Sequence, residues 1–423
     1  MHIELPYGSA TLEAQLDFVD HPRQLLPPEI GELEDAVAAV RQALEHPLGA
    51  EPLREILHKG ERTTIVVPDA SRVAGHKTYL PVLLDVLNQS GIADRDITVL
   101  IATGSHALPT EEEKRELVGE EVAARVRVRA HDCRDAEANV RLGHTVAGVP
   151  VIIDESVVKA ERLIVTGAVW FHYFAGFGGG PKLINPGCAA YETIVKNHAF
   201  TIDPAHVGLH PNCRPGHTED NPVFQDLLDS LKFVTVDFSL QTVVGKKGRL
   251  ARIQGGDLVQ VHRATAEYLR RNAAAPQAGP FPLVVASAGG HPYDINLVQA
   301  HKSLVNAARY TREGGTIVWL AECPGGAGSW GLEQSLQYPD PETLYRSLRQ
   351  EFVLNGNTAL SLMLKARAYD VILVSDLPPD WVRRLGITPA EDLAQALDLA
   401  KDKLRHVDEA LVLPFAAQTV ALD

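Results

Sequence analysis

Short apolar runs rich in valine and isoleucine alternate with helical patterns along the chain, and this alternation restricts the fold more than any other feature. The runs that predict strands are Thr63–Val67, Ile97–Ile101, Val126–Ala130, Val151–Ile153, Leu163–Thr166, Phe233–Val236, Leu283–Ala286, Thr316–Leu320, Val371–Val374 and Ala410–Leu413. Most are continuously apolar, as in strands covered on both faces of a parallel sheet. Helical periodicity is found in Leu33–Leu44, Leu80–Gln89, Leu258–Asn272, Leu297–Arg309 and Pro389–Leu404. Strand–helix alternation of this kind predicts doubly wound α/β layers.

A segment rich in alanine, proline and glycine, Ala273–Pro282, is the best candidate for a linker. A chain of 423 residues is expected to form two domains. We therefore expect an N-terminal α/β domain over residues 1–275 and a C-terminal α/β domain over residues 276–423, with the active site in the cleft between them. A capping box, Thr110 with Glu113, predicts the start of a further, acidic helix.

The composition excludes several classes of protein. The formal net charge of −14 argues against a nucleic-acid partner, because phosphate binding needs a basic face. The four cysteines are far apart and form no CxxC pair, which argues against a disulfide framework and fits a reducing compartment. The N-terminal segment lacks the basic and apolar regions of a signal peptide, and the longest uncharged stretch, Leu163–Pro181, contains too much glycine to span a membrane. We expect a cytoplasmic protein without a membrane partner.

The segment Gly167–Phe200 contains the strongest local signal, the run FAGFGGGPK. Gly178, Gly179 and Gly180 would let backbone N–H groups approach an anion, and Lys182 adds a positive charge. A structural loop explains the same glycines, and the run is not a Walker A motif because no GKS or GKT is present. A second cluster, Gly326–Gly331, matches GxGxxG by letter, but Cys323–Pro324 separates it from the preceding strand, so it indicates NAD binding only weakly.

Several polar residues follow predicted strands, where open α/β sheets bind ligands. Asp69 and Arg72 follow the first strand, His106 the second, and His172 comes soon after Leu163–Thr166. His198 ends a predicted helix over Ala190–Asn197.

These residues suggest chemistry, although each also has a structural explanation. Neutral imidazole suits nickel or zinc, and an imidazole titrates near neutral pH as a general base. Arg72 and Lys302 could bind a carboxylate, with Gln299 on the same helical face as Lys302. A satisfied structural histidine and a solvated surface cation are the alternative interpretations.

The chain resembles the nickel-dependent lactate racemases. The resemblance covers nearly the whole chain and includes ELPYG, HPLGAEPL, VVPDASR, IATGSHALPT, FHYFAGFGGGPKLINPG, the KNH that ends at His198, GGHPYDINLVQAHK and REGGTIV. It implies a nickel pincer nucleotide tethered to Lys182, with His198 as the protein ligand to nickel. It also implies that His106 and His172 are the two general acid–bases.

The same resemblance implies that Arg72, Gln299 and Lys302 hold the carboxylate and hydroxyl of a 2-hydroxy acid, with Asp69 beside Arg72. The implied reaction removes the α-hydrogen as hydride to the cofactor and returns it to the other face of a planar keto acid. The family relies on separate cofactor-biosynthesis proteins, and a homo-oligomer is compatible with the sequence.

Two positions depart from the lactate-active pattern. Val298 replaces an aromatic residue, and Asn357 falls where that pattern carries tryptophan. Both changes open or polarise the pocket, so malate, a longer aliphatic acid or a sugar acid is as good a candidate substrate as lactate. The alternative function is a zinc-dependent hydrolase or lyase that uses His106, His172 and His198 as ligands; a non-enzymatic cofactor-binding protein is a third.

Overall fold

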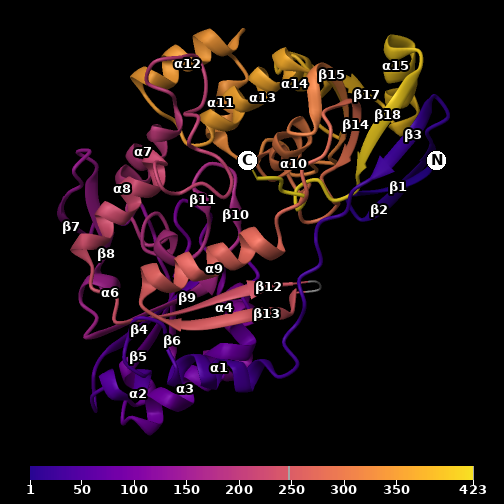
Figure 1. Ribbon diagram of the computed structural model, residues 1–423. Coiled ribbons are helices and arrows are strands. Elements are labelled where there is room, and N and C mark those ends of the chain that lie inside the picture. Colours follow the sequence, from indigo (N-terminus) through magenta and orange to yellow (C-terminus); the bar gives the residue numbers. More distant parts are fainter. Residues whose placement is uncertain (246–247, 423) are drawn as a thin grey trace. The chain divides into compact units, whose positions relative to one another are not determined.

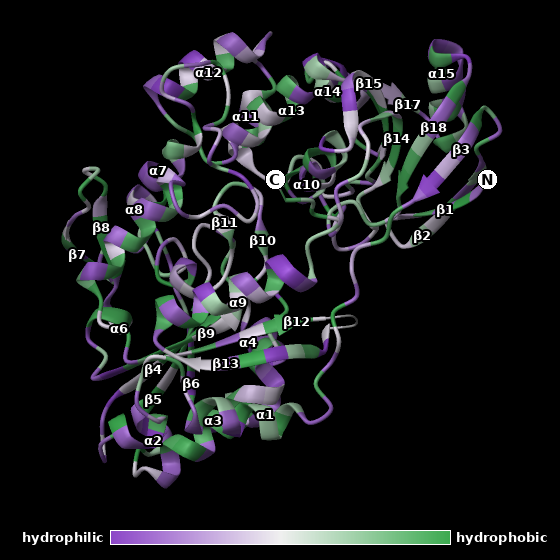
Figure 2. Ribbon diagram, in the orientation of Figure 1, coloured by the Kyte–Doolittle hydropathy of each residue, from purple (hydrophilic) through white to green (hydrophobic). Residues whose placement is uncertain are grey.

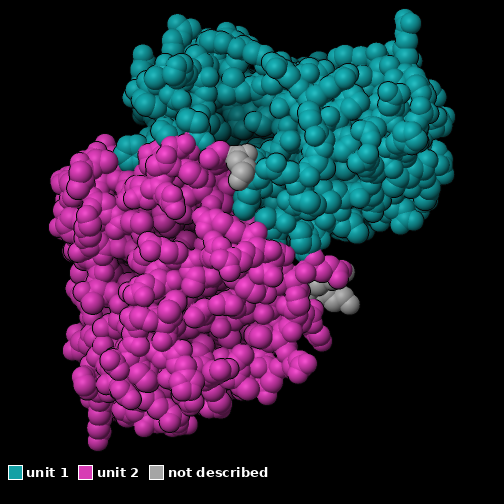
Figure 3. Space-filling model, viewed as in Figure 1, with its two compact units in different colours: residues 1–28, 199–211, 273–423 teal, residues 29–198, 212–272 magenta. Residues whose placement is uncertain are grey.

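The computed structural model describes residues 1–245 and 248–422, and the chain divides into two compact units (Figure 3). Unit 1 comprises residues 1–28, 199–211 and 273–423, and unit 2 comprises residues 29–198 and 212–272. Each unit is built on a six-stranded sheet whose strands are almost all parallel. This confirms the predicted fold class of two doubly wound α/β domains. The division differs from the predicted domains 1–275 and 276–423, because the N-terminal strands pair and pack with the C-terminal sheet.

The sheet of unit 2 has a point at which its connections diverge. Its order is β13 (Leu250–Gly256), β12 (Phe238–Val244), β9 (Arg162–Ala168), β4 (Thr63–Pro68), β5 (Ile97–Ala102) and β6 (Arg127–Ala130). Only β12 and β13 pair in antiparallel fashion. From β4 the chain adds β5 and β6 on one side, whereas β9 and β12 lie on the other. The helices α1 (Ala36–Glu45) and α3 (His76–Gln89) cover one face, and α9 (Leu258–Asn272) covers the other (Figure 1).

The sheet of unit 1 is fully parallel. Its order is β17 (Thr388–Ala390), β16 (Asp370–Val374), β15 (Thr311–Leu320), β14 (Phe281–Ser287), β18 (Val407–Leu413) and β3 (Val19–Gln24). One face carries α15 (Leu393–Leu404) and the hairpin of β1 (His2–Tyr7) and β2 (Ala10–Gln15), which share one hydrophobic core with the sheet. The helix α10 (Leu297–Ala308) lies on the opposite face, where Ser303 accepts a hydrogen bond from the Trp319 indole at 2.7 Å.

Shorter elements complete the two units. They are the antiparallel pairs β7 (Asn139–His144) with β8 (Pro150–Asp154) and β10 (Phe171–His172) with β11 (Gly176–Phe177), and the helices α2 (Leu53–Ile56), α4 (Glu111–Val118), α5 (Glu120–Arg125), α6 (Glu155–Val158), α7 (Tyr191–His198), α8 (Pro222–Ser230), α11 (Trp330–Ser335), α12 (Pro341–Gln350), α13 (Gly356–Ala368) and α14 (Pro379–Arg384). Figure 2 shows hydrophobic central strands and helices with mixed faces, as expected for α/β layers. Within the described part of the chain, none of the helices has the length and apolar character needed to cross a membrane.

Most local predictions are confirmed, and a few are wrong. The capping box is present, with Thr110 and Glu113 each accepting a backbone hydrogen bond from the other. Phe233–Val236 is not a strand, because the chain forms a 3-10 turn over Leu231–Phe233 and β12 begins only at Phe238. Residues 151–153 do form a strand, but β8 pairs with β7 rather than joining the main sheet.

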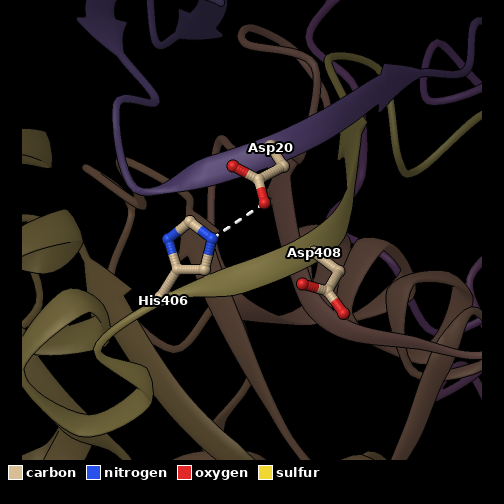
Figure 4. A group of neighbouring side chains, drawn as sticks. All are labelled: Asp20, His406 and Asp408. Carbon is tan, nitrogen blue, oxygen red and sulfur yellow. Dashed lines mark hydrogen bonds and ion pairs between the residues drawn. The ribbon is translucent and has the colours of Figure 1, made fainter.

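The outer edge of the unit 1 sheet carries a group of polar side chains on β3 and at the start of β18 (Figure 4). The register pairs Val19 with Val407, so Asp20 lies opposite Asp408. His406 Nε2 lies 2.8 Å from Asp20 Oδ2. The ligand atoms of these three residues lie within 4.8 Å of one another, but all three are exposed, and exposed acidic groups are common without an ion.

Candidate active site

The candidate residues of unit 2 gather where the connections of its sheet diverge. Asp69 and Arg72 follow β4 and His106 follows β5, whereas His172 follows β9 on the other side of β4. Chains that leave adjacent parallel strands in opposite directions open a crevice at the carboxyl ends of those strands. All four residues were predicted to follow strands. Because these strands are parallel and belong to one sheet, the four residues lie at the same edge of that sheet.

Asp69 and His106 form a close pair at this edge. Asp69 Oδ2 lies 2.5 Å from His106 Nδ1, and Asp69 Oδ1 accepts a hydrogen bond from the Ser71 backbone N–H at 3.1 Å. Burial raises the pKa of Asp69, but His106, Ser71 and the Arg72 charge outweigh it and hold that pKa below its usual value. The ionised carboxylate keeps a proton on Nδ1 of His106, so the neutral ring presents an accepting Nε2. The His106 side chain is 53% exposed, which leaves it accessible to a small molecule.

Arg72 is held by an aromatic ring that the sequence did not single out. Its guanidinium carbon lies 4.9 Å from the centroid of the Trp170 ring. The pKa of Arg72 is lowered by burial, although the Asp69 charge acts against this. Trp170 also lies against Gly178, where a Cβ would come within 2.2 Å of the ring. Trp170 therefore links the cationic group to the glycine-rich loop.

The glycines of this loop have an internal structural role. Gly179 has φ +72°, and a Cβ there would come within 2.1 Å of the Ala168 carbonyl oxygen. The backbone N–H of Gly178 donates to the Trp170 carbonyl at 2.8 Å, and that of Gly180 donates to Gln241 Oε1 at 2.8 Å. These N–H groups already have acceptors within the protein, which favours the structural interpretation of the glycines. Their part in cofactor binding stays a prediction.

Phe174 lies among three of the predicted residues. Its ring centroid is 4.5 Å from that of His172 and 5.1 Å from that of His198, and Lys182 Nζ lies 5.3 Å from it. Lys182 follows β11, and His198 is the last residue of α7. The family resemblance implied roles for Lys182 and His198, but nothing in the sequence singled out the phenylalanine that they share.

The environment lowers the pKa of both Lys182 and His198. Burial and the neighbouring Arg72 charge lower the pKa of Lys182 to about 7. Burial and the Lys182 charge lower the pKa of His198 to about 3, against a hydrogen bond to the Ile194 backbone. A neutral amine is a nucleophile, and a neutral imidazole is a metal ligand. This pair fits a group that is covalently tethered at one end and holds nickel at the other.

His172 has a different hydrogen-bonding pattern from His106. Its Nδ1 accepts a hydrogen bond from the Ala175 backbone N–H at 3.2 Å. Because a backbone N–H can only donate, the neutral His172 ring carries its proton on Nε2. The two predicted acid–bases therefore present opposite states at Nε2, an acceptor on His106 and a donor on His172.

Gln299 and Lys302 belong to unit 1, on α10, which follows β14. Lys302 Nζ donates to Gln299 Oε1 at 2.6 Å, so the two side chains form a pair on one helical face. The glycine cluster Gly326–Gly331 contacts the start of this helix, since Leu297 N donates to the Gly326 carbonyl at 2.9 Å. Packing against α10 accounts for these glycines without a nucleotide.

The zinc-dependent alternative needs three ligands in one place. In residues 1–245 and 248–422, the group of three His, Cys, Asp or Glu side chains with ligand atoms within 4.8 Å of one another is Asp20, His406 and Asp408. His106, His172 and His198 do not form such a group, which disfavours that alternative.

Comparison with known proteins gives a consistent result along the whole chain. Residues 7–208 match the family model described as the lactate racemase N-terminal domain, and residues 277–417 match the lactate racemase C-terminal domain. The lactate racemase of Thermoanaerobacterium thermosaccharolyticum is 28% identical over 423 residues, covering 98% of this chain and 97% of the relative. The lactate racemase of Lactiplantibacillus plantarum is 27% identical over 424 residues, covering 97% of each.

Two solved structures share the fold. The lactate racemase apoprotein of T. thermosaccharolyticum matches with a TM-score of 0.88 and 27% identity, and each chain is covered completely. A protein of Thermotoga maritima matches with a TM-score of 0.67 over 93% of this chain and 100% of that one, at 16% identity, which is a likeness of fold alone.

Proposed function

Because this chain belongs to the lactate racemase family and is an isomerase, we propose that it interconverts the two enantiomers of a small 2-hydroxy acid. The observation that carries the proposal is a pair of imidazoles near one sheet edge, each oriented by a hydrogen bond at Nδ1. His106 is held by Asp69 with an accepting Nε2, and His172 is held by Ala175 with a donating Nε2. Inversion needs both, because the hydroxyl points in opposite directions in the two enantiomers.

In the proposed reaction His106 takes the hydroxyl proton of one enantiomer at Nε2. When the other enantiomer forms, His172 acts as an imidazolium that gives the proton on Nε2 to the oxygen and is left as the neutral ring. The two rings exchange roles in the reverse direction. Arg72 binds the substrate carboxylate, because its planar guanidinium presents paired donors and lies over the Trp170 ring. Gln299 and Lys302 of unit 1 are proposed to bind the substrate as well.

The proposed cofactor is a nickel pincer nucleotide, which supplies an acceptor for the hydride that leaves the α-carbon. Lys182 would hold it covalently, because an amine with a pKa of about 7 is a nucleophile at neutral pH. His198 would bind nickel, because its pKa of about 3 keeps it neutral at any working pH. Separate biosynthetic proteins are expected to supply the group, so the chain must be loaded before it is assayed.

The relatives' names support lactate as a substrate, and two residues of unit 1 support a wider range. Asn357 is buried near the start of α13, and Val298 is half-buried on α10, which packs against that helix. A polar amide and a small aliphatic group fit a larger or more polar acid than lactate. Malate, a longer aliphatic 2-hydroxy acid and a sugar acid are therefore proposed beside lactate.

A chiral assay of the loaded protein against this panel of acids tests the proposal. We expect His106→Ala and His172→Ala each to stop inversion while nickel and the adduct mass on Lys182 stay bound, and Lys182→Ala to lose the adduct. His58→Ala, an exposed histidine of unit 2, is the matched control and should retain activity. Full activity in either His106→Ala or His172→Ala would contradict the two-base assignment. Stoichiometric zinc without an adduct would favour the hydrolase.

A further inference from the structure

The helix α8 (Pro222–Ser230) was not predicted from the sequence, yet its buried face is unusually polar. Asn221 at its N-cap, Asp226 in its middle and Ser230 at its end are all nearly inaccessible to solvent. A buried polar group is costly unless it is hydrogen-bonded, so the partners of these three side chains indicate what the helix does. Each of the three side chains has a partner in a segment that carries a residue of the candidate site.

Asn221 holds the segment that contains Phe174. Its Nδ2 donates to the Phe174 carbonyl at 2.8 Å, while its Oδ1 caps α8 by accepting from Val223 N at 3.1 Å. The Phe174 ring contacts His172, Lys182 and His198. One side chain thus caps the helix and fixes the aromatic residue that these three side chains share.

Ser230 holds the segment that follows Lys182. Its Oγ accepts a hydrogen bond from Asn185 Nδ2 at 3.1 Å and donates to the Leu227 carbonyl at 2.6 Å. Asn185 is fully buried, and its backbone N–H donates to the Pro181 carbonyl at 3.2 Å. The turn that carries Lys182 is therefore tied to the end of α8.

Asp226 holds the residue next to His198. One carboxylate oxygen accepts from Asn197 Nδ2 at 2.8 Å and the other from Thr145 Oγ1 at 2.5 Å. Asn197 Nδ2 also donates to the Val223 carbonyl at 3.1 Å, so both amide hydrogens point to α8. Burial raises the pKa of Asp226, although both hydrogen bonds lower it. Such a carboxylate is costly to bury, and its fixed oxygens orient the last turn of α7.

We infer that α8 positions the candidate site through its hydrogen bonds to the segments that carry the site residues. In this arrangement Asp226 is a positioning residue that fixes the His198 imidazole through Asn197. The inference rests on the proposed function, because it treats His198 as a metal ligand. Groups that orient a metal ligand without touching the metal typically change metal affinity about 10–100-fold when they are removed. An aspartate suits this position because it accepts two hydrogen bonds at once, whereas an asparagine accepts on one atom only.

The chain offers matched variants that separate positioning from general stability. Asp226→Ala and Asn197→Ala both break the link to His198. Asp229→Ala, one turn along α8, removes a carboxylate that accepts hydrogen bonds from the Val146 backbone and Lys232 instead. Thr145→Val breaks the second bond of Asp226 but leaves the bond to Asn197 intact.

Two readouts decide the question. In the unloaded chain, hydrogen exchange of a peptide over residues 194–201 should speed up in Asp226→Ala and Asn197→Ala, and stay near wild type in Asp229→Ala and Thr145→Val. In the loaded protein, the first pair should shift the visible absorption of nickel and release nickel to a chelator about 10-fold faster or more. Asn197→Ala keeps the experiment decisive if Asp226→Ala does not fold.

Equal exchange and equal nickel release in the two pairs of variants would overturn the inference. The first readout needs no cofactor. A wild-type chain that never takes up nickel would therefore count against the proposed function, while the exchange measurement would still decide whether Asp226 holds the end of α7.

Discussion

Replacing Lys182 with methionine should stabilise the unloaded chain, by an amount that depends on pH. The fall in the pKa of Lys182 from 10.5 to about 7 corresponds to about 5 kcal/mol, because each factor of ten in protonation is worth about 1.4 kcal/mol. Lys182 keeps some contact with solvent, so we expect roughly half of this, ~2–3 kcal/mol. Methionine has a similar length and carries no charge, so it removes this cost without opening a large cavity.

The pH dependence has a definite sign. Between pH 7 and 10.5 the unfolded chain binds a proton at Lys182 that the folded chain does not, so wild-type stability rises with pH across this range. The advantage of Lys182→Met is therefore complete below pH 7 and decreases towards pH 10.5. For a unit of this size, we expect a rise in Tm of about 5–10 °C near pH 6.5 and a much smaller rise near pH 9.5.

Thermal unfolding followed by circular dichroism at several pH values measures this directly. Lys196→Met, at an exposed lysine of the same α7 that carries His198, is the control and should change Tm little at any pH. A rise in Tm for Lys182→Met that is the same at every pH would refute the reasoning. It would mean that the variant improves packing only, and that the amine is charged at neutral pH in the folded chain.

Two further substitutions test the support of Arg72 and the loop. Gly178→Ala places a Cβ within 2.2 Å of the Trp170 ring, so we expect a loss of about 1–3 kcal/mol of stability, measured by urea unfolding; a neutral effect would show that the ring is free to move. Trp170→Leu removes the ring under Arg72, which is worth about 0.5–2 kcal/mol. The KM for the 2-hydroxy acid should rise roughly 2–30-fold with a smaller change in kcat, and an unchanged KM would remove Trp170 from the description of the site.

Local chemistry made much of the fold predictable. The strand β4 is buried along its whole length, and its apolar run was visible in the sequence. The helix α9 spans Leu258–Asn272, as its periodicity predicts. The N-terminal strands were missed, because β3 is stabilised by pairing with β18 near the other end of the chain, and no local pattern reports such a pairing.

The site was predictable where the residues themselves carry reactive groups, and less so where other residues support them. Asp69, His106 and Arg72 were identified from their positions after strands, and the structure brings them together through contacts and charge. Trp170 and Phe174 lie within the segment Gly167–Phe200, but the sequence did not single them out. Their roles depend on the contacts of the Trp170 ring with Arg72 and of the Phe174 ring with Lys182. The spacing of residues along the sequence does not specify these contacts.

The failures of periodicity have a common physical cause. The strand β12 was misplaced because its sequence, FSLQTVV, puts polar side chains at buried positions, among them Gln241. When residues are sorted only into apolar and polar, a residue such as Gln241 argues against a buried strand. In the structure, however, Gln241 accepts a hydrogen bond from Gly180 N and so holds the loop before Lys182. The helix α8 was missed, and its buried face carries Asp226, whose hydrogen bonds reach towards His198. Burying each group is unfavourable unless a partner compensates, and here the partners are the segments of the site. Positions at which the apolar pattern fails are therefore where a positioning role should be sought first.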